Sequence, residues 1–227
     1  MPVNKATALD ALLQQKLLPL FYHDDADVCC NVMQALYNGG VRLFEFTNRG
    51  ANALTNFRLM KEQAAQQMPD LMLGIGTIKN VAAANAFMDA GADFIVCPTI
   101  NAEVAKVVHA NGMLWVPGCM TPTEIAAAEE AGATLVKVFP GNILGPGYIS
   151  AVKELFPDLR LMPTGGTEPE ATNLQAWFGS GVAAVGMGSK LITAAMLRDR
   201  DYTAIEAAAR SVLQLIAQTS GSAKVAS

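Results

Sequence analysis

The sequence is poor in the side chains on which metal sites and catalytic triads depend. It has only two histidines, His23 and His109, among 227 residues, so a zinc site or a Ser-His-Asp triad has little to draw on. The cysteines have neither metal-ligand spacing nor the density of a disulfide-rich secreted protein, so we expect reduced, mostly buried thiols and no bound metal. They are Cys29, Cys30, Cys97 and Cys119.

Basic clusters and long apolar runs are also absent. The formal net charge is -4, and a chain without a Lys/Arg cluster has no surface to neutralise the phosphates of a nucleic acid. No apolar stretch reaches the length that spans a membrane, and residues 1–20 have the pattern of an amphipathic helix rather than of a signal peptide. We therefore expect a soluble, cytoplasmic protein that binds a small molecule.

Short apolar strands alternate with helical segments along the whole chain. Eight such units favour a single (β/α)8 TIM barrel with an N-terminal helix over an open sheet, with one domain over residues 1–227 and a flexible tail at 219–227. Several helical segments end in glycine just before a strand, as at Gly91 and Gly132. The expected strands are residues 18–22, 43–47, 71–77, 94–98, 114–118, 134–140, 159–164 and 183–188.

Lys137 lies in the middle of one of these apolar strands. Because an unpaired ammonium is costly to bury, such a lysine is either ion-paired or a neutral amine, and a neutral amine attacks carbonyl carbons. A lysine that extends from the strand end to solvent, or a purely structural ion pair, is the alternative.

Other polar residues share the interior with Lys137 if side chains alternate along each strand. The alternation places Lys137 and Glu45 inside the barrel, together with Ile75 and Thr77 of the third strand. Glu45 is then the natural proton shuttle, and Arg49, two residues beyond its strand, can grip a carboxylate with its planar guanidinium. A structural salt bridge for Glu45 and a surface position for Arg49 remain open.

Glycines follow each of the last two strands, at Gly165-Gly166 and at Gly188-Ser189. Glycine-rich loops after these strands expose backbone N–H groups, which form the usual phosphate site of this barrel. Two tight turns without a ligand would have the same pattern, but their occurrence after both strands favours anion binding.

Other polar residues have simpler interpretations. Asp24, Asp25 and Asp27 follow the first strand and are expected to cap the next helix, although His23 and the first two aspartates could touch a substrate. His109 is expected on a helix surface.

Five segments together resemble the 2-keto-3-deoxy-6-phosphogluconate (KDPG) and 4-hydroxy-2-oxoglutarate (KHG) aldolases. The resemblance runs in order from about Leu18 to Leu191. Its motifs are Phe44-Glu45-Phe46-Thr47-Asn48-Arg49, Gly74-Ile75-Gly76-Thr77-Ile78-Lys79-Asn80, Val116-Pro117-Gly118-Cys119, Val136-Lys137-Val138-Phe139-Pro140 and Pro163-Thr164-Gly165-Gly166.

The resemblance implies a class I aldolase on a TIM barrel, commonly a homotrimer, that needs no metal and no cofactor. It implies that Lys137 forms the Schiff base and that Glu45 is the acid/base group. Arg49 and Thr77 match the residues that hold the pyruvate carboxylate. The phosphate-binding positions match Gly165, Gly166, Gly188 and Ser189, and the residues that line the pocket match Pro98, Phe139 and Thr164.

Two segments depart from the family pattern. Met187 stands where the family often has a further glycine, as in the related phosphogalactonate aldolases, and Asn48 and Gly50 change the surroundings of Arg49. The expected reaction is cleavage of KDPG to pyruvate and glyceraldehyde 3-phosphate, and of KHG to pyruvate and glyoxylate. The alternatives are cleavage of the galactonate epimer, a phosphate-binding barrel isomerase or synthase, and a non-catalytic sugar-phosphate binding protein.

Overall fold

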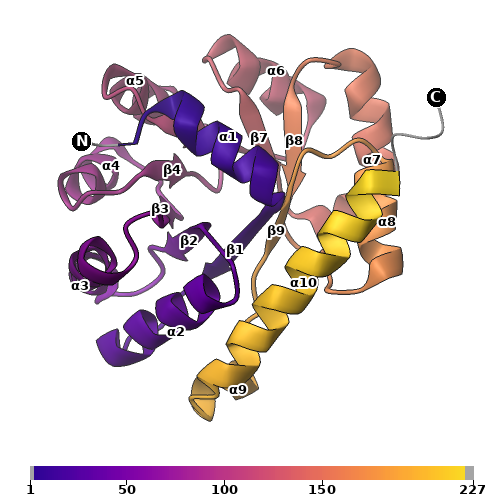
Figure 1. Ribbon diagram of the computed structural model, residues 1–227. Helices are drawn as coiled ribbons and strands as arrows, with labels where there is room; N and C mark the ends of the chain where they lie inside the picture. Colours follow the sequence, from indigo (N-terminus) through magenta and orange to yellow (C-terminus); the bar gives the residue numbers. More distant parts are fainter. Residues whose placement is uncertain (1–2, 223–227) are drawn as a thin grey trace.

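Parallel strands surround the centre of the molecule in two hydrogen-bonded groups (Figure 1). The computed structural model describes residues 3–222. One sheet has the order β5-β4-β3-β2-β1-β9 and the other has the order β6-β7-β8. The strands are β1 (Leu17–Phe21), β2 (Leu43–Thr47), β3 (Met72–Gly76), β4 (Phe94–Val96), β5 (Leu114–Val116), β6 (Gly118–Cys119), β7 (Leu135–Val138), β8 (Arg160–Pro163) and β9 (Val185–Met187).

The two sheets join at both ends and close a barrel. Pro117 alone separates β5 from β6, and because proline has no N–H to donate, it interrupts what is otherwise one strand. Its carbonyl still accepts a hydrogen bond from the N–H of Lys137 at 2.8 Å. On the other side, the N–H of Ala183 donates to the carbonyl of Leu161 at 2.9 Å, and Thr164 forms a bridge with Gly186. The TIM-barrel prediction is therefore confirmed.

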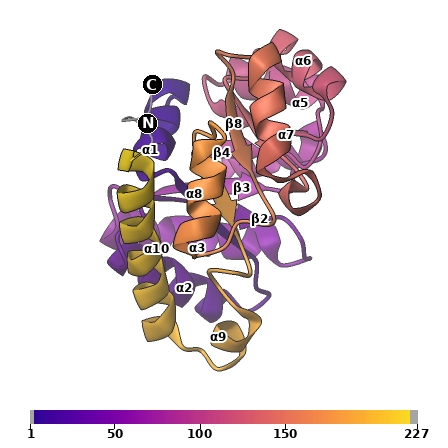
Figure 2. The same ribbon diagram turned by 90° about the vertical axis from the view of Figure 1, so that its right-hand side faces the viewer.

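Helices follow the strands and cover the outside of the barrel. Figure 2 shows α8 between α7 and α10 on one side of the molecule. The five glycines that end α2, α4, α5, α6 and α8 have positive φ, which is the left-handed conformation that stops a helix. The helices are α1 (Lys5–Gln15), α2 (Ala26–Asn38), α3 (Ala53–Gln67), α4 (Val81–Asp89), α5 (Ala102–Ala110), α6 (Pro122–Glu130), α7 (Gly141–Leu155), α8 (Ala171–Gly179), α9 (Ala194–Arg198) and α10 (Tyr202–Ser222).

The N-terminal helix α1 covers the end of the barrel at which the strands begin. Its apolar residues Leu9 and Leu12 pack in one cluster with barrel residues that include Leu43. The helix is shorter than the sequence indicated, because Lys16 takes a left-handed conformation with φ 57° and β1 starts at the next residue. The Gln15 amide donates to the carbonyl of Leu43 at 2.7 Å, so a polar side chain satisfies backbone groups where the strands start.

Two apolar layers confirm most of the predicted alternation of side chains. Leu43 and Leu135 belong to the interior layer with α1, whereas Phe44 and Val136 belong to the outer layer under the helices. Ile75 was predicted to face inward, and this is wrong, because it packs in the outer layer. Ile75 lies opposite Phe46, which also faces the helices, and Thr77, predicted on the same face as Ile75, lies beyond the end of β3 with φ 62°.

The C-terminal helix α10 extends to Ser222, four residues into the segment that was expected to be a tail. Thr219 is 8% exposed and its hydroxyl donates to the carbonyl of Leu215. The rest of the expected tail, 223–227, lies outside the described residues. Within residues 3–222, none of the helices has the length and apolar content needed to cross a membrane.

Candidate active site

Lys137 lies on β7 with its side chain buried inside the barrel. The side chain is 8% exposed, and its Nζ lies 3.7 Å from Oε2 of Glu45. This separation fits an ion pair and is longer than a hydrogen bond. The same Nζ lies 5.6 Å from the ring centroid of Phe139. The predicted convergence of a lysine and a glutamate on the barrel axis is therefore present in the structure.

Glu45 projects from β2 against the third strand. Its side chain is 1% exposed, and neither carboxyl oxygen has a hydrogen-bond partner among the described residues. Burial raises the pKa of Glu45 above that of an ordinary glutamate, and the positive charges of Lys137 and Arg49 oppose this shift. A carboxyl group with a raised pKa holds a proton more readily than an ordinary glutamate, which suits a group that must both accept and return a proton.

A glycine at position 76 makes this placement of Glu45 possible. A Cβ built on Gly76 would lie 1.7 Å from Oε1 of Glu45, so any larger residue would occupy the space of the carboxylate. Because β2 and β3 pair in register, with Thr47 opposite Gly76, the carboxylate lies over the backbone of its neighbouring strand.

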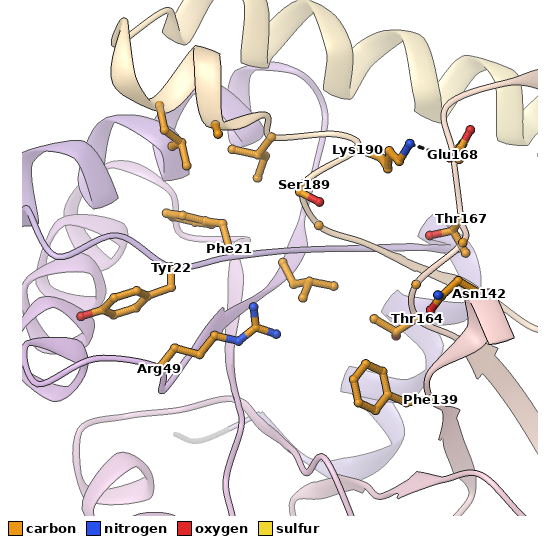
Figure 3. A pocket seen from close by; sticks show the side chains of 17 residues that line it. Phe21, Tyr22, Arg49, Phe139, Asn142, Thr164, Thr167, Glu168, Ser189 and Lys190 are labelled. Atoms are coloured by element: carbon orange, nitrogen blue, oxygen red, sulfur yellow. Dashed lines mark ion pairs between the residues drawn. The ribbon is translucent and has the colours of Figure 1, made fainter.

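Arg49 follows β2 on an exposed loop and enters a pocket at the end of the barrel where the strands terminate. Figure 3 shows its guanidinium directed into the middle of this pocket, toward Phe139 and Thr164. A Cβ on Gly50 would lie 1.9 Å from the hydroxyl oxygen of Tyr22. The glycine that departs from the family pattern therefore lets the Arg49 loop pack against Tyr22.

The pocket has a volume of about 580 Å³, which is in the range of small-molecule sites. Of the residues predicted for the site, those that line it are Arg49, Phe139, Thr164, Gly165, Gly166, Gly188 and Ser189. The hydroxyl of Thr164 is buried and has no hydrogen-bond partner among the described residues. The pocket therefore brings together an arginine and both glycine-containing loops, with Thr164 in its lining.

The loop after β8 is held in place by helix α8. Gly166 has φ 72°, a conformation that favours glycine. The carbonyl of Gly166 accepts hydrogen bonds from Asn173 Nδ2 and Trp177 Nε1, both at 3.1 Å. In a planar peptide the next N–H points opposite to this carbonyl. The N–H of Thr167 is thereby directed away from α8, and no acceptor for it is found among residues 3–222.

Met187 does not obstruct the second loop. It is fully buried at the end of β9 and packs in the outer apolar layer. Its side chain therefore points away from the pocket, and the loss of a glycine at this position leaves Gly188 and Ser189 in the lining.

Four predicted site residues do not line the pocket. Lys137 and Glu45 lie deeper in the barrel, where Phe139 connects them to the lining. Thr77 and Pro98 follow the ends of β3 and β4. The carbonyl oxygen of Pro98 lies 2.3 Å from a Cβ built on Gly118, the residue that pairs with Lys137. Pro98 therefore packs over the strand beside the lysine.

Several residues that line the pocket were not predicted to belong to the site. Asn142, at the start of α7, lies against Gly166, whose added Cβ would be 2.8 Å from Asn142 Cα. Glu168 and Lys190 form an ion pair at the edge of the pocket (Figure 3). In the sequence, Glu168 and Lys190 can be recognised only as charged residues that come soon after the two glycine-containing loops, a pattern that Asn142 does not share.

Other polar residues have structural roles. Asp25 caps α2 as predicted, and accepts a hydrogen bond from the N–H of Asp27 at 2.9 Å. Asp24 instead accepts a hydrogen bond from the Tyr22 hydroxyl. His109 is partly buried rather than on the surface, because its ring packs edge-on against Trp115 and its Nε2 lies 3.1 Å from the carbonyl oxygen of Ala131.

The cysteines are reduced and mostly buried, as predicted. The four cysteines are free, and only Cys30 is partly exposed. Within residues 3–222, no three His, Cys, Asp or Glu side chains are arranged to hold a metal ion.

Comparisons with known proteins agree with this geometry. A family model described as KDPG and KHG aldolase matches residues 9–208. The 2-dehydro-3-deoxy-6-phosphogalactonate aldolase of Escherichia coli is 40% identical over 139 residues, which are 61% of this chain and 66% of that enzyme. The 2-dehydro-3-deoxy-phosphogluconate aldolase of Pseudomonas aeruginosa is 30% identical over 219 residues, which are 95% of this chain and 96% of that enzyme.

A solved structure also matches over nearly the whole chain. The crystal structure of a 4-hydroxy-2-oxoglutarate/2-dehydro-3-deoxyphosphogluconate aldolase superposes with a TM-score of 0.77 at 30% identity, and the match covers 92% of this chain and 98% of that one. The family model, the relatives and the fold all lead to one conclusion: the chain belongs to the KDPG and KHG aldolase family.

Proposed function

We propose that this protein is a class I aldolase that cleaves KDPG to pyruvate and glyceraldehyde 3-phosphate. The observation that carries the proposal is the buried pair of Lys137 and Glu45 beneath a pocket that holds Arg49 and two glycine-containing loops. An amine beside a carboxyl group of raised pKa suits imine chemistry, which needs a nucleophile and a proton shuttle. The names of the relatives from Pseudomonas aeruginosa and other bacteria support the same substrate.

The reaction uses the residues as follows. Nζ of Lys137 attacks the C2 carbonyl carbon, and loss of water gives a protonated imine. Glu45 then takes the proton of the C4 hydroxyl, the C3–C4 bond breaks, and its electron pair moves into the imine to form an enamine. The aldehyde product leaves, the enamine carbon C3 takes up a proton from Glu45, and water hydrolyses the imine to release pyruvate and the free lysine.

The remaining site residues bind the two ends of the substrate. Arg49 and Thr77 hold the carboxylate beside the imine, and Pro98, Phe139 and Thr164 line the path between the ends. Gly165, Gly166, Gly188 and Ser189 bind the phosphate, through backbone N–H groups and the hydroxyl of Ser189. The shorter substrate KHG is a dicarboxylate without a phosphate, so its C1 carboxylate binds beside the imine and nothing in it reaches the phosphate position.

Borohydride reduction in the presence of pyruvate tests the central step. The reagent reduces an imine to a stable amine, so the protein should gain the mass of one reduced pyruvate unit, located on Lys137 by peptide mapping. Lys137→Met should gain no adduct and show no cleavage, while Lys106→Met, which removes a lysine that is 71% exposed on α5, should behave like the parent. An isomerase, a synthase or a binding protein would give no adduct in any variant, and this outcome would refute the proposal.

The galactonate epimer of KDPG is a second candidate substrate. It is favoured by the 40% identity to the Escherichia coli phosphogalactonate aldolase and by Met187 before Gly188. A comparison of kcat/KM for both epimers and for KHG decides between them, because the two sugar acids differ only in the configuration at C4.

We further propose that the protein is a cytoplasmic homotrimer. Met120 and Ile143 are 41% and 67% exposed and follow the adjacent strands β6 and β7, so another copy of the chain could cover them. Light scattering after gel filtration should give three times the mass of one chain. Ile143→Glu should lower that mass, and Leu155→Glu, at the other end of α7 and 66% exposed, should not.

A further inference from the structure

An ion pair lies at the edge of the pocket, beside the glycine-containing loops. Lys190 Nζ is 2.7 Å from Oε1 of Glu168, and the two side chains are 58% and 34% exposed. Both residues line the pocket together with Ser189 and Gly166. Figure 3 shows Lys190 reaching along the edge of the pocket to Glu168, with the Ser189 hydroxyl below it.

Charge is distributed unequally between the ends of the pocket. Its charged lining residues are Arg49, Lys190 and Glu168. Arg49 lies on the β2 side, and Lys190 lies on the opposite side with the glycine-containing loops (Figure 3). A substrate with a carboxylate at one end and a phosphate at the other would meet one cation at each end. Glu168, however, puts a negative charge at the end where the phosphate would bind.

The two partners differ in how firmly they are held. The N–H of Glu168 donates to Oδ1 of Asn173 at 2.9 Å, and Asn173 also donates to the carbonyl of Gly166. The segment around Glu168 is therefore fixed to α8. Lys190 has a long flexible side chain with a rotatable ammonium group, and Glu168 is its only ion-pair partner among residues 3–222. Lys190 is thus the partner that can change position.

We propose that Lys190 breaks its ion pair with Glu168 and binds the phosphate of the substrate, which makes the enzyme prefer the phosphorylated substrate. Glu168 weakens phosphate binding, because it competes for this lysine. The inference rests on the proposed function, because it assumes that the substrate phosphate enters between the two glycine-containing loops. A phosphate carries a charge of about -1.5 to -2 at neutral pH, so it attracts the ammonium more strongly than a single carboxylate does. The ion pair is then a resting position for Lys190.

Substitutions of the two partners should act in opposite directions. Lys190→Met removes a charged hydrogen-bond donor, so KM for KDPG should rise about tenfold. Glu168→Gln removes a competing charge, and since exposed ion pairs are weak, KM for KDPG should fall about two- to fivefold. If the ion pair only ordered the loops, both substitutions would raise KM.

The experiment compares kcat/KM for KDPG with kcat/KM for KHG in each variant. The ratio of the two values should fall in Lys190→Met and rise in Glu168→Gln. Lys106→Met and Glu103→Gln are matched controls, because these residues form an exposed ion pair of the same 2.7 Å length on α5, and the ratio should stay at the parent value in both. Shifts of the same sign in the two test variants, or no shift in either, would overturn the proposal.

Inorganic phosphate provides a readout that does not depend on turnover. Added phosphate should raise the melting temperature of the parent, less so in Lys190→Met and more so in Glu168→Gln. If phosphate does not stabilise the parent, or stabilises all three proteins equally, the inference is wrong whatever the enzyme does. If these shifts occur but pyruvate is not trapped by borohydride, the aldolase function fails and Lys190 is still a phosphate ligand.

Discussion

Gly76→Ala should displace the Glu45 carboxylate without changing Lys137 or any residue that lines the pocket. The added Cβ would lie 1.7 Å from Oε1, 2.4 Å from Cδ and 2.8 Å from Cγ of Glu45, whereas ordinary contact begins at 3.4 Å. Oε1 must therefore move by about 1.7 Å, which is the difference between the contact distance of 3.4 Å and its distance of 1.7 Å from the added Cβ. Glu45 is 1% exposed, so the carboxylate cannot avoid the new methyl group by turning into bulk solvent.

A displacement of this size should greatly slow the proton transfers that Glu45 carries out. Because a misplacement of 1 Å can cost about a hundredfold in rate, we expect kcat of Gly76→Ala to fall by at least about 100-fold. Borohydride trapping of pyruvate should persist, since Lys137 lies on β7 and not beside Gly76. Overpacking should also lower the free energy of unfolding by about 1–3 kcal/mol, so rates must be measured well below the melting temperature of the variant.

The value of kcat is measured from the rate of pyruvate release, with lactate dehydrogenase reducing the pyruvate as it forms. Gly179→Ala is the matched control, because Gly179 ends α8 and its added Cβ has no atom within 4 Å apart from its chain neighbours and the backbone of its own helix. Its kcat should equal that of the parent. Combining Gly76→Ala with Glu45→Gln should give a kcat no lower than that of Glu45→Gln alone, since both act on one group. A parent-like kcat in Gly76→Ala, or a multiplicative loss in the double variant, would refute the reasoning.

Three further outcomes are expected. Glu45→Gln should lower kcat about a hundred- to ten-thousand-fold while pyruvate is still trapped; near-normal turnover would mean that another group moves the protons. In the parent, kcat should decline as the pH falls through the raised pKa of Glu45, because the carboxylate that accepts the C4 hydroxyl proton is lost there, at higher pH than for an ordinary glutamate; a rate profile of Glu45→Gln that keeps this decline would assign it to another residue. Gly166→Val, whose Cβ would meet Asn142 Cα at 2.8 Å, should raise KM for KDPG and spare KHG, and equal losses on both substrates would show that the loop shapes the barrel rather than the phosphate site.

The sequence by itself determined the barrel and the direction of most interior side chains. Short apolar strands separated by helices that stop at glycine leave few alternatives to a parallel barrel. Strict alternation within β2 and β7 then predicted Leu43 and Leu135 inside and Phe44 outside, as the structure shows. The burial of Lys137 in β7 was predicted from the apolar residues on either side of it, since a strand of this kind has no solvent-facing side.

Only the tertiary structure decided the features that depend on contacts between strands and loops. The predicted direction of Ile75 is wrong, because its pairing opposite Phe46 turns it toward the helices, and Thr77 has a left-handed backbone beyond the end of β3. The space for the Glu45 carboxylate is created by Gly76 on the neighbouring strand. The ion pair of Glu168 with Lys190 joins two loops that follow different strands. Local patterns of residues specify secondary structure, but the distance between two side chains far apart in the chain is set only when the barrel closes.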